Sequence, residues 1–173
     1  MTFPCMFRSA MEQKEPPEGH HFVGKKDALI KAKRTFKTLG DRDVLLIYHQ
    51  GRFYALDYYC YHAGSKLETG DIEEIGGKLC IICPKHKYKI SLAEGEGLCK
   101  SIDKTQKKTA PIWYSKGVKQ RVHTVTENNG DVYVELSHMP RWVESDYFQG
   151  EEGKEKRAKA EATAEANDGM DSS

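Results

Sequence analysis

The sequence predicts an all-β fold, an antiparallel sandwich or barrel, because short strand-like runs alternate with turn signals at close intervals. The clearest pair of runs, 44–49 and 52–57, flanks a two-residue turn that ends in Gly51 and therefore predicts a β-hairpin. A second pair, 119–126 and 132–136, is separated by an Asn/Gly-rich turn. Within it, residues 132–136 alternate apolar and polar side chains as a half-buried strand does.

The remaining segments complete this pattern. Short strands are expected at 22–24, 34–38, 79–83 and 88–92, and a helix of one or two turns at 27–33. The predicted domain therefore spans residues 21–137. Residues 1–20, rich in Pro and Gly, are expected to form a flexible arm. Residues 138–173 lack an apolar face, so we expect a disordered charged tail with at most a transient helix at 154–166.

Composition excludes several classes of protein. The chain has 173 residues and a mean hydropathy of −0.70, and its longest apolar run is far shorter than the roughly 18 residues of a membrane span. Net charge is +1, but residues 144–173 hold nine acidic and four basic residues, which leaves +6 for residues 1–143. That charge is too weak to indicate nucleic-acid binding. Five cysteines without a secretory signal argue against a disulfide framework and favour a reducing compartment, by default the cytoplasm.

Two short motifs inside the β region carry the chemistry. Cys60-x-His62 and Cys83-x-x-His86 each place one thiol and one imidazole within a few residues of each other, and 20 residues separate the two motifs. Three interpretations fit two cysteines and two histidines. These are a structural zinc site, a catalytic Cys–His pair, and an iron–sulfur site in which the cysteines hold one iron and the histidines the other.

The spacing weighs against the first two interpretations. Cys-x-His is tighter than the usual zinc knuckle, where two or more residues separate the ligands of a pair. A catalytic pair needs a third residue to orient the imidazole, and the sequence does not identify one. Two mixed loops, each giving one ligand to each iron, use all four residues. A zinc-binding or non-redox protein-interaction module stays as the alternative.

At this point the residues resemble a known family. Residues 60–65 (Cys-Tyr-His-Ala-Gly-Ser) and 83–86 (Cys-Pro-Lys-His) resemble the paired cluster loops of Rieske [2Fe–2S] proteins. More narrowly, 70–73 (Gly-Asp-Ile-Glu) and 116–121 (Lys-Gly-Val-Lys-Gln-Arg) resemble the small Rieske-type ferredoxins. The resemblance covers about residues 21–137. It implies a Rieske-type antiparallel β sandwich with a small cluster-binding subdomain.

The resemblance also implies a ligand set. One [2Fe–2S] cluster per chain would be held by Cys60 and Cys83 on the buried iron and by His62 and His86 on the outer iron, close to the surface. The expected function is that of a one-electron carrier without a substrate site of its own. It would pass electrons between a reductase and an oxidase or oxygenase through the surface histidines, with redox proteins as partners and without nucleic-acid binding or membrane insertion.

The sequence departs from some Rieske relatives. Those of respiratory and photosynthetic complexes carry a further cysteine in each cluster loop, and these two form a disulfide. Here Ser65 and Lys85 stand in those neighbourhoods, so no such disulfide can form. The serine that follows the second histidine in those relatives is also missing, and Lys87 stands where the family usually has Gly. With fewer donors to the sulfides, we expect a reduction potential in the lower part of the range of about −150 to +300 mV.

A Rieske oxygenase is a different class that the sequence disfavours. It would need a mononuclear iron held by two histidines and a carboxylate in a separate domain, and the residues after 137 offer only His138. The remaining cysteines and histidines are expected to be structural: Cys80 and Cys99 in the core, Cys5 an exposed thiol, and His20, His21, His49, His123 and His138 on strands or at the surface. Lys66, Lys85, Lys87 and Lys89 form either a solvated face or a docking surface for an acidic partner.

Overall fold

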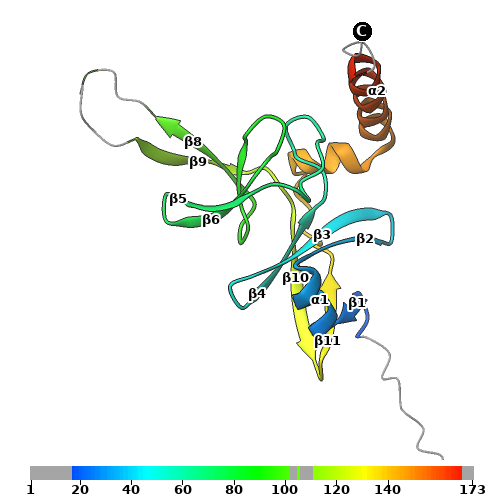
Figure 1. Cartoon of the computed structure of the whole chain (residues 1–173). Coiled ribbons are helices and arrows are strands. Elements are labelled where there is room, and N and C mark those ends of the chain that lie inside the picture. The colour runs from blue at the N-terminus through cyan, green and yellow to red at the C-terminus, as the bar shows by residue number, and fades with distance from the viewer. Residues whose placement is uncertain (1–16, 102–104, 106–110, 169–173) are drawn as a thin grey trace, which may run out of the picture.

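The computed structural model describes residues 17–101, 105 and 111–168 (Figure 1). In chain order its elements are β1 (His20–Lys25), α1 (Lys26–Ala32), β2 (Arg34–Leu39), β3 (Arg42–His49), β4 (Arg52–Asp57), β5 (Ile72–Ile75), β6 (Lys78–Ile82), β7 (Lys89–Ser91), β8 (Glu96–Ser101), β9 (Ile112–Val118), β10 (Val122–Asn128), β11 (Asp131–Glu135), the 3-10 helix η1 (Glu144–Gln149) and α2 (Glu151–Asp168). The predicted all-β, antiparallel fold is confirmed.

The strands form two antiparallel sheets. The larger has the order β1-β11-β10-β4-β3-β2, and the smaller has the order β5-β6-β7-β8-β9. The chain passes from the large sheet to the small one through the β4–β5 connection. Both Cys/His motifs lie close to this connection. One is in the β4–β5 connection and the other in the β6–β7 turn (Figure 1). The small sheet is the subdomain that the resemblance implies.

The core explains why β3 is apolar without interruption. Residues 44–47 are all buried because β3 lies inside the large sheet and is covered on both faces. Leu45 and Ile47 pack into a cluster that also contains Cys60 and Cys83, while the alternate residues pack on the other face. Burial of each such aliphatic side chain contributes about 1.5–3 kcal/mol. The two motif cysteines therefore lie in the main hydrophobic core.

Three strands differ from the sequence prediction. The strands β5, β8 and β9 were not expected, whereas the hairpins, the other short strands and the α1 helix were. The reason is local: nearly every position of β9 is exposed, so it shows no alternation of apolar and polar residues. β5 has the sequence Ile-Glu-Glu-Ile, which carries no alternation either. Their pairing with β6 and β8 makes them strands.

The charged C-terminal region needs two corrections. Residues 138–173 were expected to form a disordered tail, but η1 is part of the folded domain, with Ser145 and Phe148 buried. The contacts that hold η1 to the sheet are mostly polar, so the hydropathy pattern of the sequence did not indicate them. α2 is also a formed helix over Glu151–Asp168, where at most a transient helix at 154–166 was expected. It lacks an apolar face, as expected, and Gly153 is its buried residue. No helix in the described part of the chain is long and apolar enough to cross a bilayer.

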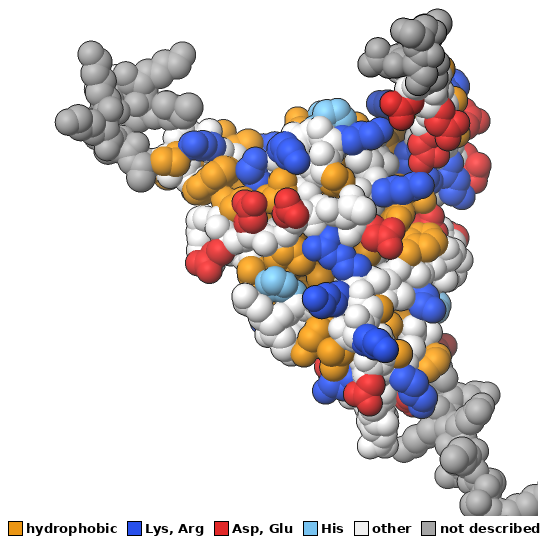
Figure 2. Space-filling model, viewed as in Figure 1, with side chains coloured by type: hydrophobic (Ala, Val, Ile, Leu, Met, Phe, Trp, Pro, Cys, Tyr) orange, Lys and Arg blue, Asp and Glu red, His pale blue; other side chains and the backbone are white. Residues whose placement is uncertain are grey.

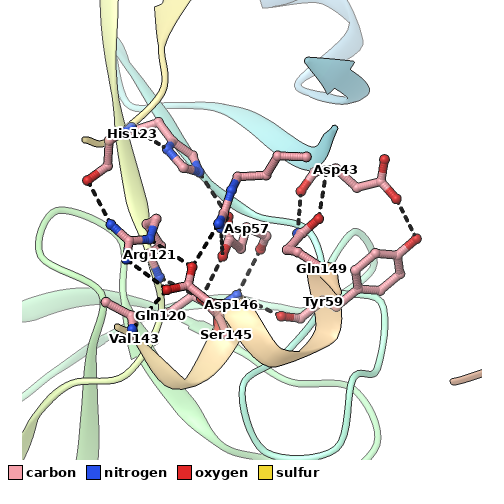
Figure 3. A network of polar contacts seen from close by, with 12 residues as sticks. Asp43, Asp57, Tyr59, Gln120, Arg121, His123, Val143, Ser145, Asp146 and Gln149 are labelled. Carbon is pink, nitrogen blue, oxygen red and sulfur yellow. Dashed lines mark hydrogen bonds and ion pairs between the residues drawn. The ribbon is translucent and has the colours of Figure 1, made fainter. Parts of the chain in front are cut away.

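A buried polar network attaches η1 to the sheet (Figure 3). At its centre Asp57, which is 0% exposed, accepts hydrogen bonds from Arg42 Nη1 at 2.7 and 2.9 Å and from the Ser145 hydroxyl at 2.6 Å. His123 Nδ1 accepts the Ser137 N–H at 3.0 Å, so the ring hydrogen is on Nε2, 2.9 Å from Asp57. Each buried polar group here has a partner, as stability requires.

Asp146 of η1 joins the same network. Its carboxylate accepts hydrogen bonds from Arg42, from two guanidinium nitrogens of Arg121, and from the Val143 N–H, at 2.7–2.9 Å. Burial alone would raise the pKa of Asp146. The hydrogen bonds from Arg121, Val143 and Arg42 outweigh it and lower the pKa to about 2.

Asp146→Asn is therefore expected to remove a pH-dependent part of the stability. An aspartate with a lowered pKa in the folded state stabilises the fold above its unfolded pKa of about 3.9, and this contribution is lost as the pH falls toward 2. We expect the variant to lose about 2 kcal/mol of unfolding free energy at neutral pH, and the difference from the unchanged protein to shrink in acid. Urea unfolding at several pH values measures this. A difference that stays constant with pH would contradict it.

Candidate metal centre

The first motif lies in a closed backbone loop. The Cys60 N–H donates to the Ser65 carbonyl, and the Gly64 N–H donates to the Cys60 carbonyl, each at 2.8 Å. Gly64 has a φ of +76°, the left-handed conformation that favours glycine. This closure turns the chain sharply around residues 61–63, and the His62 side chain is exposed there.

The second motif lies in a loop with the same closure. The Cys83 N–H donates to the Tyr88 carbonyl at 2.8 Å, and the Lys87 N–H donates to the Cys83 carbonyl at 2.9 Å. Lys87 occupies the position that corresponds to Gly64 and has a φ of +58°. The two motifs therefore form two loops of matching hydrogen-bond pattern, each beginning at a buried cysteine and exposing a histidine.

Lys87→Gly is expected to stabilise the protein. The left-handed conformation is strained for any residue with a Cβ, and glycine removes this strain. The free energy gained exceeds the cost of the greater conformational entropy of glycine in the unfolded chain by about 0.5–1 kcal/mol. Lys85→Gly is the matched control, because it removes the same charge from an exposed position of the same turn without a positive φ. Chemical denaturation of both variants measures the difference. If Lys87→Gly destabilises as much as Lys85→Gly, the strain is absent.

The four side chains of the motifs come together as two pairs. Cys60 and Cys83 are 0% exposed and lie in the same hydrophobic cluster, where the two thiols interact. This interaction, together with burial, raises the pKa of Cys60, and it lowers the pKa of Cys83. His62 and His86 are exposed, and their ring centroids lie 4.9 Å apart with the rings nearly perpendicular. The thiols thus form an inner pair and the imidazoles an outer pair.

Polar groups of the loops act on the pKa values of the inner thiols. The backbone N–H groups of His62 and Ala63 lower the pKa of Cys60, and those of His86 and Lys85 lower the pKa of Cys83. Such donors stabilise negative charge on sulfur. The Ser65 hydroxyl, a donor that the sequence analysis did not count, also lowers the pKa of Cys83.

The arrangement of the thiols and imidazoles shows which donors the paired loops offer to a metal centre. Within the described ranges, no three His, Cys, Asp or Glu side chains converge on one point as the ligands of a mononuclear ion do. An inner thiol pair and an outer imidazole pair offer one donor pair to each of two irons. The residues present therefore fit a [2Fe–2S] cluster with mixed ligands.

Aromatic rings hold one of the two histidines in place. The Tyr88 ring stacks on His62 with centroids 3.9 Å apart and planes 14° from parallel, and Tyr61 meets Tyr88 edge to face at 5.7 Å. The Lys116 ammonium lies 5.0 Å from the centre of the Tyr88 ring. The His62 side chain is thus exposed, but one face of its ring is packed against Tyr88.

Gln120 holds the backbone of the first loop on both sides of Cys60. Its side chain is fully buried, its carbonyl accepts the Tyr61 N–H at 2.9 Å, and its amide donates to the carbonyls of Asp57 and Tyr59 at 2.9 and 2.8 Å (Figure 3). The same side chain that clamps the loop thus contacts the end of β4. Gln120 is a positioning residue for Cys60, and its location explains why the loop keeps its shape.

The other cysteines and histidines lie away from the paired loops. Cys80 is fully buried, as predicted, whereas Cys99 is only partly buried, and Cys5 lies outside the described residues. His123 belongs to the polar network and His20 lies 3.5 Å from Glu135. All four described cysteines are free thiols.

The predicted lysine group divides between two places. Lys66 and Lys85 line one pocket together with α2, whereas the Lys89 ammonium donates to the Lys87 carbonyl at 2.7 Å. Lys66 pairs with Glu161 of α2 at 3.3 Å, and Lys85 is exposed in the second loop. Lys89 turns toward the small sheet, where it lies 5.8 Å from the Trp113 ring. Sequence reasoning also missed Tyr88, Gln120 and the residues of η1 and α2 that contact the first loop. The only signal for Gln120 was its place in the 116–121 motif.

The two sheets and the paired loops define a class of protein, an all-β protein of the Rieske type. Among solved structures, the fold is similar to the ferredoxin of carbazole 1,9a-dioxygenase from Nocardioides aromaticivorans IC177, with a TM-score of 0.50 and 19% identity over 68% of this chain and 98% of that one. It is also similar to a structure described as a putative NADH-dependent nitrite reductase small subunit from Mycobacterium tuberculosis, with a TM-score of 0.51 and 16% identity over 69% and 96%.

Comparison of the sequence identifies the family. A family model described as soluble Rieske-type ferredoxin matches residues 21–139. The chain is 48% identical over 126 residues to the Rieske domain-containing protein of Homo sapiens. The aligned residues cover 73% of this chain and 80% of that protein. It is 37% identical over 60 residues, 35% of this chain and 47% of the relative, to the ferredoxin component of an alkene monooxygenase system from Xanthobacter autotrophicus. The chain belongs to the Rieske-type ferredoxin family, whose members are electron carriers.

Proposed function

We propose that this chain holds one [2Fe–2S] cluster through Cys60, Cys83, His62 and His86 and carries one electron at a time between redox proteins. The observation that supports this most strongly is the match between the two loops. Each begins at a buried cysteine, is closed by the same two backbone hydrogen bonds, and contains an exposed histidine. Family membership supports the same cofactor.

The two cysteines and the two histidines would have different roles. Cys60 and Cys83 would bind the inner iron in the core, where water is excluded and the surrounding N–H groups stabilise the negative charge of the sulfur atoms. His62 and His86 would bind the outer iron and present their ring edges to solvent. When bound, the cluster supplies reversible one-electron chemistry. The exposed imidazoles then provide the shortest route for the electron between the cluster and a docked partner.

The partners we propose are a reductase and an oxidase or oxygenase. One relative is the ferredoxin component of a monooxygenase system, and one similar structure is described as a complex of an oxygenase with a ferredoxin. Both descriptions name a ferredoxin together with an oxygenase, which supports this choice of partners. We also place the function in the cytoplasm, where the described free thiols stay reduced.

Metal analysis and redox titration of anaerobically purified protein test the function. We expect two irons and two acid-labile sulfides per chain, a visible charge-transfer absorption, and a single one-electron transition. Colourless protein that holds zinc and shows no redox transition would overturn the proposal and favour the alternative, a zinc-binding interaction module.

A further inference from the structure

A pocket lies between α2 and the two Cys/His loops, with a volume of about 310 Å³. The first loop contributes residues 63–66 and Thr69, the second contributes Pro84 and Lys85, and α2 contributes Arg157, Ala160 and Glu161. Ala63 is adjacent in sequence to His62, and Lys85 is adjacent to His86. The pocket is therefore lined by one sequence neighbour of each exposed histidine.

The α2 wall of this pocket is attached to the first loop. The Arg157 guanidinium lies 3.5 Å from the centre of the Tyr59 ring, and its Nε donates to the Phe148 carbonyl at 3.3 Å. A Cβ added to Gly64 would lie 2.5 Å from the Phe148 ring and 2.8 Å from Arg157, so loop and C-terminal segment are in direct contact. α2 rises past the loops on their side of the molecule (Figure 1).

The pocket carries positive charge. Its charged lining residues are Lys66, Lys85 and Arg157 against the single acid Glu161. Lys and Arg side chains gather where α2 meets the body of the protein (Figure 2). The Lys66–Glu161 pair is more than half exposed at both ends, so it contributes at most about 1 kcal/mol, and another carboxylate can replace Glu161.

We propose that this pocket receives an acidic side chain of the redox partner protein, so that α2 sets how the partner approaches His62 and His86. This inference rests on the proposed function, because an electron carrier needs a partner oriented on its exposed ligands. Opposite charges across an interface steer the encounter and fix its orientation. The family match ends at residue 139, so α2 gives this chain a contact beyond the matched domain.

Binding of a short polyglutamate peptide tests the pocket, with the chemical shifts of α2 amides as the readout. Ala160→Trp fills the pocket and is expected to weaken binding about tenfold, which corresponds to about 1.4 kcal/mol. Ala162→Trp is the matched control, because two residues along a helix turn the side chain to another face, and it should bind as the unchanged protein does. Both alanines are exposed, so neither change disturbs the core.

Glu161→Gln supplies a second, opposite readout. It removes the acid that competes with the peptide for Lys66, so binding should become severalfold tighter. Three results would overturn the proposal: no binding to the unchanged protein, equal weakening by both tryptophan variants, or shifts that map away from the pocket. Iron and sulfide analysis of the same samples separates the two hypotheses. If the unchanged protein contains no iron and no sulfide, the proposed function is refuted. If the two tryptophan variants contain the cluster and bind the peptide equally, only the proposed role of the pocket is refuted.

Discussion

Cys60→Ala is expected to abolish cluster retention, while Cys80→Ala keeps a full complement of iron. Both cysteines are 0% exposed and both are free thiols, so the two substitutions remove the same atom from equally buried sites. Only Cys60 pairs with Cys83 and receives backbone N–H groups of its own loop. The Cys80 sulfur contacts the Lys78 carbonyl and packs with a separate hydrophobic cluster.

Iron and sulfide content of freshly purified variants measures this difference. Cys80→Ala should cost packing stability alone, about 1–2 kcal/mol for the loss of one small buried group. Near-normal iron in Cys60→Ala with loss of iron in Cys80→Ala would mean that the wrong thiol has been assigned. His86→Ala is expected to behave as Cys60→Ala does, because it removes half of the outer pair.

Asp57→Ala is expected to bring the domain close to unfolding. It leaves the Arg42 guanidinium with Asp146 as its one remaining carboxylate partner, and it leaves the Ser145 and His123 donors without their acceptor. Loss of one partner from a buried ion pair costs about 3–5 kcal/mol, and domains of this kind have a total stability of about 5–15 kcal/mol. Because Asp57 ends β4 directly before the first loop, the loop should also lose its order.

Asp131→Ala provides the matched control for this second prediction. Asp131 pairs with Lys25 at the surface, where the lysine side chain is 72% exposed, so its removal should cost no more than about 1 kcal/mol. Denaturant unfolding of both variants gives the two free energies. Equal losses would show that the buried network does not hold η1 to the sheet.

The sequence predicted those parts of the molecule whose determinants are local. The hairpin of β3 and β4 follows from a turn signal between two apolar runs, and α1 from its own short pattern. The four residues proposed as ligands stand out in the sequence because each pair lies within one short motif. By contrast, β9 is exposed at most of its positions and is a strand only through its pairing with β8.

The parts that the sequence could not predict depend on contacts between distant segments. Gln120 reaches the backbone around Cys60, and Ser145 reaches Asp57, across separations of about 60 to 90 residues. Such polar contacts leave no periodic pattern in the sequence. η1 is held by carboxylate, hydroxyl and guanidinium groups rather than by an apolar face, so its composition is that of a solvated tail.

Pulsed electron paramagnetic resonance of the reduced protein, prepared with natural and with ¹⁵N-labelled histidine, tests the central claim most directly. The account predicts hyperfine coupling to two nitrogen nuclei bound to iron, and this coupling changes with the histidine label. A reduced iron–sulfur signal without coupling to histidine nitrogen would contradict it, because the imidazoles would then not be ligands.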